Sequence, residues 1–335
     1  MTTIVAQIAP QRSTQYADLA GTLAPYELQL SPIADQVSDI QPVTLGGQPY
    51  LQFEMPDIPT EDQVGEFGLL SMSSAFFVCY DRLAEVEGPL LRPIDTPAAE
   101  GLPREILVSR RYRGKTNEMF THFLCNVARA SSALSRRPWS TLRLLDPLCG
   151  GGTTLFCGLH LGASVAGVDH SSKDVESTVT YTQSFLREKG IACQSKRERF
   201  KGIGRRWLLN IGKSPVQNCL LAHGKTADTA ALISGFRPHL IVGDLPYGIQ
   251  HKGELVSLLT EALPVWASLL PPSGAMALAW EARHLSREEL ISLIETVSPL
   301  HVLNDPPYNQ LAHRVDRVIK QRDVVVARPL SSTKA

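Results

Sequence analysis

Several signatures of common protein classes are missing from this sequence of 335 residues. Its six cysteines form no Cys-x-x-Cys pair and no Cys/His cluster with the spacing of zinc ligands, so we expect neither structural zinc nor a disulfide framework. No apolar run approaches the roughly 20 residues of a membrane span, and residues 1–13 lack the basic and apolar regions of a signal peptide. These absences predict a cytoplasmic protein without a metal or a membrane partner, and they leave its oligomeric state open.

Positive charge is scarce in the first part of the chain. Residues 1–100 contain 14 acidic and 3 basic side chains, whereas residues 101–335 contain 19 acidic and 30 basic ones, so the net charge of zero hides an asymmetry. Prolines at positions 89, 93, 97 and 103 mark a linker. We predict an acidic N-terminal α+β module of unknown role over residues 1–100. A larger domain over residues 105–330 is where a phosphate-binding surface is expected.

Strand and helix patterns alternate in the second part of the chain. Apolar runs predict strands at 142–146, 164–169, 216–222, 239–244, 274–280, 301–304 and 324–327. Periodic segments between them predict helices at 153–161, 173–189, 253–269 and 286–297. This order indicates an α/β fold with a doubly wound, mostly parallel, seven-stranded sheet. No helix separates the last two strands, so they are expected to pair antiparallel.

A glycine-rich turn follows the first of these strands. Residues 144–154 read Leu-Leu-Asp-Pro-Leu-Cys-Gly-Gly-Gly-Thr-Thr, and Asp169 ends the next strand, where a carboxylate can accept hydrogen bonds from ribose hydroxyls. A dinucleotide fingerprint needs a third glycine where Leu155 stands, and no Gly-Lys-Ser/Thr of a P-loop follows. The pattern therefore favours S-adenosylmethionine as cofactor. The candidate cofactor residues in this region are Asp146, Pro147, Cys149, Gly150, Gly152, Thr153 and Asp169.

A second motif, Asp244-Leu245-Pro246-Tyr247-Gly248, ends the strand at 239–244. The Asp244 carboxylate and the Leu245 carbonyl can each accept an N–H bond from an amino group, which stabilises the charge that develops when its nitrogen attacks a methyl group. Pro246 restricts the backbone of the preceding residue and so fixes the direction of that carbonyl. Tyr247 offers a face for stacking a base. We take these four residues as the candidate catalytic set.

The two motifs together resemble the amino-methyltransferases of nucleic acids, and in particular the RNA methylase group that includes the tRNA guanosine-N2-methyltransferases. Members carry Asp-Pro-Phe-Cys-Gly-x-Gly-Thr, then Asp-Pro-Pro-Tyr-Gly or Asp-Leu-Pro-Tyr-Gly, and an upstream segment similar to residues 112–117. The resemblance spans about residues 108–328. Leu148 stands where the family has Phe, and the THUMP module that precedes the domain in the family is not recognisable in residues 1–100.

The resemblance implies a Rossmann-like class I methyltransferase that uses S-adenosylmethionine. It implies methyl transfer to guanosine N2 in RNA, with tRNA as the family's substrate. DNA adenine N6 or cytosine N4 is the alternative target, and a non-catalytic module that binds the cofactor is the third interpretation. The segment with Arg113, Lys115, Thr116 and Asn117 is implied to close over the methionine end of the cofactor. Asp228 is implied to contact the adenine, with a helix-capping role as the alternative.

Two further segments have more than one interpretation. Residues 187–213 hold nine basic and two acidic side chains, with Phe200 and Trp207 interleaved. They are either a solvated insertion or an arm that contacts a nucleic-acid backbone. The candidate contact residues are Lys196, Arg197, Arg199, Arg205 and Arg206. The run Asp305-Pro306-Pro307-Tyr308 matches the base motif by its letters, but too little chain follows it, and we interpret it as a turn.

Overall fold

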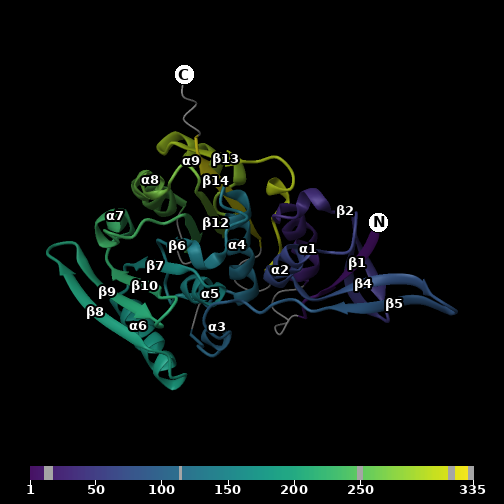
Figure 1. Cartoon of the computed structure of the whole chain (residues 1–335). Helices are drawn as coiled ribbons and strands as arrows, with labels where there is room; N and C mark the ends of the chain where they lie inside the picture. Colours follow the sequence, from purple (N-terminus) through teal and green to yellow (C-terminus); the bar gives the residue numbers. More distant parts are fainter. Residues whose placement is uncertain (11–17, 113–114, 247–251, 316–320, 331–335) are drawn as a thin grey trace.

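A computed structural model of the chain describes residues 1–10, 18–112, 115–246, 252–315 and 321–330 (Figure 1). Within these residues, no helix is long and apolar enough to cross a membrane. The strands form two sheets, a smaller one from the first hundred residues and a larger one from the rest of the chain.

The smaller sheet is entirely antiparallel, with the strand order β2-β3-β1-β4-β5. Its strands are β1 (Thr2–Ile8), β2 (Ser38–Leu45), β3 (Gln48–Met55), β4 (Ser73–Leu83) and β5 (Val86–Ile94). Two helices, α1 (Leu19–Leu30) and α2 (Glu61–Leu69), contribute buried apolar side chains to its core, where Phe67 stacks on Phe76 with ring centroids 4.8 Å apart. The proposed acidic module therefore has strands and helices of its own.

The larger sheet has the strand order β13-β14-β12-β11-β6-β7-β10-β9-β8. Its five central strands are parallel: β12 (Ala275–Glu281), β11 (Leu240–Asp244), β6 (Arg143–Asp146), β7 (Ser164–Asp169) and β10 (Gln217–His223). At one edge, β14 (Arg322–Pro329) pairs antiparallel with β12 and with β13 (Leu300–Leu303), which confirms the predicted antiparallel pairing of the last two strands.

The α/β prediction is confirmed, but the predicted count of seven strands is wrong. The basic segment forms two additional strands, β8 (Cys193–Phe200) and β9 (Gly204–Ile211), which pair antiparallel with each other. β9 also pairs antiparallel with β10, so the hairpin extends the sheet to nine strands. The many charged side chains of this segment hid its alternating pattern, because arginine and lysine occupy positions that apolar residues take in a buried strand.

Helices cover both faces of the larger sheet (Figure 1). One face carries α3 (Glu105–Val108), α4 (Glu118–Ser131), α5 (Thr153–Leu161) and α6 (Ser172–Glu188). The other carries α7 (Thr229–Leu232), α8 (Lys252–Leu269) and α9 (Arg287–Val297). Because side chains alternate along a strand, Leu144 of β6 joins one core and Leu145 joins the other. The strand ends are thereby held between two packed layers.

The smaller sheet is attached to the larger one through α4. Glu27 of α1 is buried and accepts a hydrogen bond of 2.9 Å from Asn126 Nδ2 of α4. Arg129 of α4 makes a bidentate ion pair with Glu66 of α2, with both N–O distances at 2.8 Å. The buried apolar residues of the two regions form one continuous cluster. The N-terminal region is therefore packed on the helix that begins just after the upstream motif segment.

Candidate active site

Three carboxylates lie at the carboxyl ends of adjacent parallel strands. Asp146, Asp169 and Asp244 are the last residues of β6, β7 and β11, and β6 is paired with both of the other strands. The side chains of Asp169 and Asp244 are only 9% and 11% exposed, and Asp146 is buried. This edge of an open α/β sheet is the usual place for a ligand. The sequence motifs are thus brought together where a ligand is expected.

The carboxylates make this edge electrostatically negative. Burial, together with the charges of Asp169 and Asp244, raises the pKa of Asp146 to about 7, against the lowering effect of the hydrogen bond from the Leu148 N–H. Burial also raises the pKa of Asp244, opposed by the charge of Arg322 and by a hydrogen bond from Thr116. Among the described residues, no group of three or more His, Cys, Asp or Glu converges as metal ligands would. The electrostatics of the edge favour an organic cation over an anion.

The glycine turn is held in shape by one of these carboxylates. Gly150 and Gly152 have φ values of +46° and +85°, which favour glycine, and Gly152 precedes the first residue of α5. The Gly150 N–H donates to Asp169 Oδ2 at 2.8 Å, and the buried Cys149 donates its N–H to the Val168 carbonyl at 3.0 Å. The turn and Asp169 therefore form one rigid unit.

A tyrosine from the upstream segment covers this turn. A Cβ atom added to Gly151 would lie 2.3 Å from the ring of Tyr112, whose hydroxyl hydrogen-bonds to the Thr153 hydroxyl. Arg110 Nη1 donates to the Gly151 carbonyl at 2.5 Å, and its guanidinium lies 5.0 Å from the Tyr112 ring centroid. A larger residue at 151 would therefore require the Tyr112 ring to shift.

The next residues lead from the glycine turn to Asp244. Arg113 lies outside the described residues. Lys115 Nζ donates to the carbonyls of Leu107 and Arg110 at 2.5 and 2.9 Å. The Asn117 side chain caps α4 by accepting from the Phe120 N–H at 3.1 Å. Thr116 donates its hydroxyl to Asp244 Oδ2 at 2.8 Å. Thr116 thereby contacts a residue of the candidate catalytic set.

Asp244 has one engaged and one unengaged oxygen. Arg322 Nη2, on the first residue of β14, lies 3.6 Å from Oδ2, the same oxygen that accepts from Thr116. The Oδ1 atom is buried and has no hydrogen-bond partner among the described residues. Leu245 is buried, and Pro246 is exposed at the surface. Tyr247 lies outside the described residues. An unpartnered buried acceptor is costly to maintain, which points to a donor supplied by a ligand.

The remaining cofactor candidates lie beside the turn. The Pro147 carbonyl accepts a hydrogen bond of 2.8 Å from the Thr226 hydroxyl, and Thr226 begins the 3₁₀ turn Thr226–Asp228 after β10. Asp228 directly precedes α7, but its side chain makes no capping hydrogen bond there. This geometry does not support the helix-capping alternative, and the adenine contact of Asp228 stays a prediction.

The basic candidates all lie on the β8–β9 hairpin, but their surroundings differ. Lys196 pairs with Glu198 at 2.8 Å, and Arg206 pairs with the same carboxylate at 2.7 Å. Arg205 forms an ion pair with Glu176 of α6. Arg197 and Arg199 have no carboxylate partner among the described residues.

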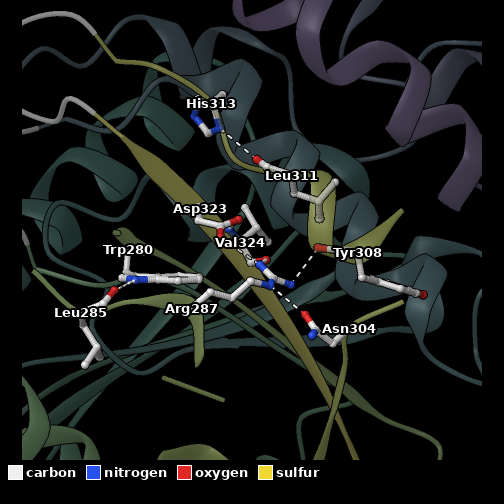
Figure 2. A network of polar contacts seen from close by, with 9 residues as sticks. All are labelled: Trp280, Leu285, Arg287, Asn304, Tyr308, Leu311, His313, Asp323 and Val324. Atoms are coloured by element: carbon white, nitrogen blue, oxygen red, sulfur yellow. Dashed lines mark hydrogen bonds and ion pairs between the residues drawn. The ribbon is translucent and has the colours of Figure 1, made fainter. Parts of the chain in front are cut away.

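The Asp305-Pro306-Pro307-Tyr308 run forms a turn, and Figure 2 shows the contacts of Arg287 with its neighbour Asn304 and with Tyr308. Arg287 of α9 donates to Asn304 Oδ1 and to the Tyr308 carbonyl, both at 2.8 Å. It also pairs with Asp323 of β14 at 3.0 Å. Asp305 is exposed, and the Tyr308 hydroxyl lies 3.1 Å from Ser131 Oγ. The run therefore fastens the connection between β13 and β14 to neighbouring helices.

Sequence reasoning did not identify Arg110 or Arg322. Arg322 is 2% exposed and reaches Asp244 only because β14 returns antiparallel beside β12. Arg110 contacts the glycine turn across 41 residues of sequence. The only local signal for Arg110 was its position just before the upstream motif, and Arg322 had no local signal.

No protein-family model and no curated protein matches this sequence. Among solved structures, the chain is similar to TrmN from Thermus thermophilus at 15% identity and a TM-score of 0.47, covering 98% of this chain and 100% of that one. It is similar to the T. thermophilus 16S rRNA N2 G1207 methyltransferase RsmC, solved with AdoMet and guanosine, at 15% identity and a TM-score of 0.40, covering 88% and 59%. The rRNA methyltransferase aviRa from Streptomyces viridochromogenes is 18% identical, with a TM-score of 0.40 and coverage of 67% and 89%. At these values, the likeness assigns no substrate, cofactor or residue role to this chain.

Proposed function

We propose that this chain is an S-adenosylmethionine-dependent methyltransferase that acts on an exocyclic amino group of a nucleic-acid base. The observation that carries the proposal is the buried Oδ1 atom of Asp244, which has no hydrogen-bond partner among the described residues. It lies at the same sheet edge as the glycine turn and two further carboxylates. A methyl-donor site and an acceptor for an amino group would thus stand side by side.

The residues at the sheet edge fit this cofactor better than a dinucleotide. Asp146, Asp169 and Asp244 would repel a pyrophosphate, whereas they favour a ligand with a sulfonium and an ammonium group. Leu155 fills the position of the third glycine and is buried. When bound, the cofactor supplies an electrophilic methyl group. Asp169 would accept hydrogen bonds from its ribose, Asp228 would contact its adenine, and Asp146 would face its positive charge.

The chain's own contribution to the reaction would be to place and polarise the amino group. Asp244 Oδ1 and the Leu245 carbonyl would accept its two N–H bonds, which concentrates electron density on the nitrogen. Asp244 would stabilise the positive charge that develops on the nitrogen as it takes up the methyl group, and it would accept the proton that the nitrogen then loses. Thr116 and Arg322 hold the other oxygen, so the carboxylate is positioned before the base arrives.

The substrate we favour is guanosine N2 in RNA, as the resemblance of the two motifs implies. The base must leave its stack to reach a buried carboxylate, which costs a few kcal/mol. Stacking on Tyr247 would offset about 1–3 kcal/mol of that cost.

The test is transfer of a labelled methyl group into total RNA and total DNA, paired with calorimetry of cofactor binding. We expect label in RNA, and nucleoside analysis should find it on the amino nitrogen of guanosine. Label in DNA instead would move the proposal to adenine N6 or cytosine N4. Binding of the cofactor without transfer to either polymer would indicate a non-catalytic module. Tight binding of NAD with no binding of S-adenosylmethionine would overturn the proposal.

A further inference from the structure

The β8–β9 hairpin ends at the same edge of the sheet as the candidate active site. β9 runs antiparallel to β10, with Arg205 opposite His223, and His223 is in turn opposite Asp169 of β7. The turn that joins β8 to β9 therefore lies at the carboxyl end of the parallel strands. Figure 1 shows the hairpin as the outer edge of the larger sheet, on the side away from β4 and β5.

The two faces of this hairpin carry different side chains, because neighbouring residues of a strand point to opposite faces. One face, which we call the arginine face, holds Arg197 opposite Trp207 and Arg199 opposite Arg205. The reverse face holds Glu198 opposite Arg206, with Lys196 beside them on β8. Five basic residues that are mixed in the sequence are thereby sorted into a set of three and a set of two.

On the reverse face the basic side chains are paired with a carboxylate or hydrogen-bonded to the backbone. Glu198 pairs with Lys196 at 2.8 Å and with Arg206 at 2.7 Å. Arg206 also donates to the carbonyls of Leu232 and Ser234 at 3.1 and 2.8 Å, which fastens the hairpin to the end of α7. Arg206 therefore has a structural role, and we do not count it or Lys196 as contacts for an outside anion.

The arginine face has an excess of positive charge. Arg199 stands directly opposite Arg205, and like charges in that position destabilise a pair of strands. Glu176 of α6 pairs with Arg205, and no other described carboxylate pairs with these arginines. Arg205 Nε is buried without a hydrogen-bond partner among the described residues. An anion bound at this face would relieve both the repulsion and the unsatisfied donor.

The arginine face is also hollowed and aromatic. A cavity of about 760 Å³ is lined by Arg197, Arg199, Arg205 and His223, together with residues 202–204 of the turn and with Glu198 and Phe200 of the reverse face. Trp207 holds the guanidinium groups of Arg197 and Arg205 at 5.3 and 5.4 Å from its ring. This stacking keeps the two guanidinium groups in fixed positions, which lowers the entropy cost of binding phosphates.

We propose that the arginine face binds backbone phosphates of the nucleic-acid strand whose target base enters at Asp244. β9 and β11 are four strand positions apart in the sheet, which corresponds to about 19 Å. A polymer spans that distance and a single nucleotide does not. The inference rests on the proposed function for the position of the base, whereas phosphate binding at the hairpin is measured without catalysis.

The experiment measures binding of a fluorescein-labelled single-stranded RNA of mixed sequence to the full chain across a series of salt concentrations. The test variant is R197A/R199A, and the matched control is K196A, which removes a positive charge from the same strand on the reverse face. Each phosphate contact contributes about 0.7 to the slope of log affinity against log salt for a single strand. We expect R197A/R199A to flatten the slope by about 1.4. K196A should leave it unchanged.

Two further measurements keep the outcome interpretable. The R197K/R199K variant retains both charges and should restore most of the slope, and thermal unfolding of all variants should coincide. Equal slopes for R197A/R199A and the wild type would overturn the proposal, as would competition by polyglutamate as effective as that by unlabelled RNA. If the arginine-dependent slope is found but no methyl group is transferred, the proposed function fails and the hairpin proposal stands. If methyl is transferred to RNA but the slope of R197A/R199A is unchanged, the proposed function stands and the hairpin proposal fails.

Discussion

Glu27 in the N-terminal region is buried, Asp244 at the edge of the larger sheet has a side chain that is only 11% exposed, and loss of solvation raises the pKa of both carboxylates. Glu27 accepts four hydrogen bonds, from the Ser71 N–H and hydroxyl, the Met72 N–H and the Asn126 amide. Asp244 has Thr116 and Arg322 at one oxygen and no partner among the described residues at the other. Burial and a raised pKa therefore do not distinguish a structural carboxylate from a functional one. The number of its hydrogen bonds does.

The largest effect is expected for Asp244→Ala. Turnover should fall by about 10²–10³, because a buried acceptor aimed at the developing charge is lost. Cofactor affinity should stay close to that of the wild type. Single-turnover transfer of labelled methyl and calorimetry measure the two quantities. Asp305→Ala, in the similar but exposed motif, is the control and should retain full turnover. A variant of Asp244 that stays active would remove it from the mechanism.

Glu27→Gln should reduce the stability of the fold and leave turnover unchanged. An amide keeps one acceptor oxygen but presents N–H groups to donors, so the free energy of unfolding should fall by about 1–3 kcal/mol. Turnover per folded molecule should not change, because the described hydrogen-bond partners of Glu27 are Ser71, Met72 and Asn126, none of which belongs to the candidate active site. Urea unfolding followed by circular dichroism gives the stability. Loss of turnover without loss of stability would assign Glu27 a role in the reaction.

Arg322 lowers the pKa of Asp244, and removing its charge should raise that pKa. The reactive form of Asp244 is the carboxylate, so the acid limb of the rate profile should move to higher pH in Arg322→Met. At a fixed pH on this acid limb, turnover should fall by about tenfold for each unit by which the pKa rises. Arg322→Lys keeps the charge and should restore the profile. An unshifted profile with reduced turnover would assign Arg322 a packing role only.

The smallest effect is expected in the pH dependence of cofactor binding, which tests the negative charge of Asp146 at the edge of the sheet. Burial raises the pKa of Asp146 to about 7, so its charge is lost below that pH and present above it. Affinity for the cationic cofactor should therefore rise with pH up to about 7 and then level off, by at most about tenfold per pH unit. Asp146→Asn should give a flat profile by calorimetry. A wild-type profile without this rise would show that Asp146 does not face the positive charge.

Much of the fold could be predicted from local patterns. The alternation of strands and helices, the glycine turn after β6 and the carboxylates at three strand ends all follow from periodicity and residue type. The two hairpin strands were not predicted, because four of the eight residues of β8 are charged and show no apolar alternation. The contact of Arg322 with Asp244 was not predictable either, since it depends on β14 returning beside β12.

The sequence by itself determined which residue types stand at the ends of the parallel strands and which part of the chain carries positive charge. Only the tertiary structure decided which carboxylate is saturated with hydrogen bonds and which has an oxygen left over. It also decided which basic side chains are neutralised by Glu198 and which have no carboxylate partner among the described residues. The reason is that hydrogen bonding and charge pairing depend on neighbours in space, and Thr116 and Asp244 are 128 residues apart along the chain.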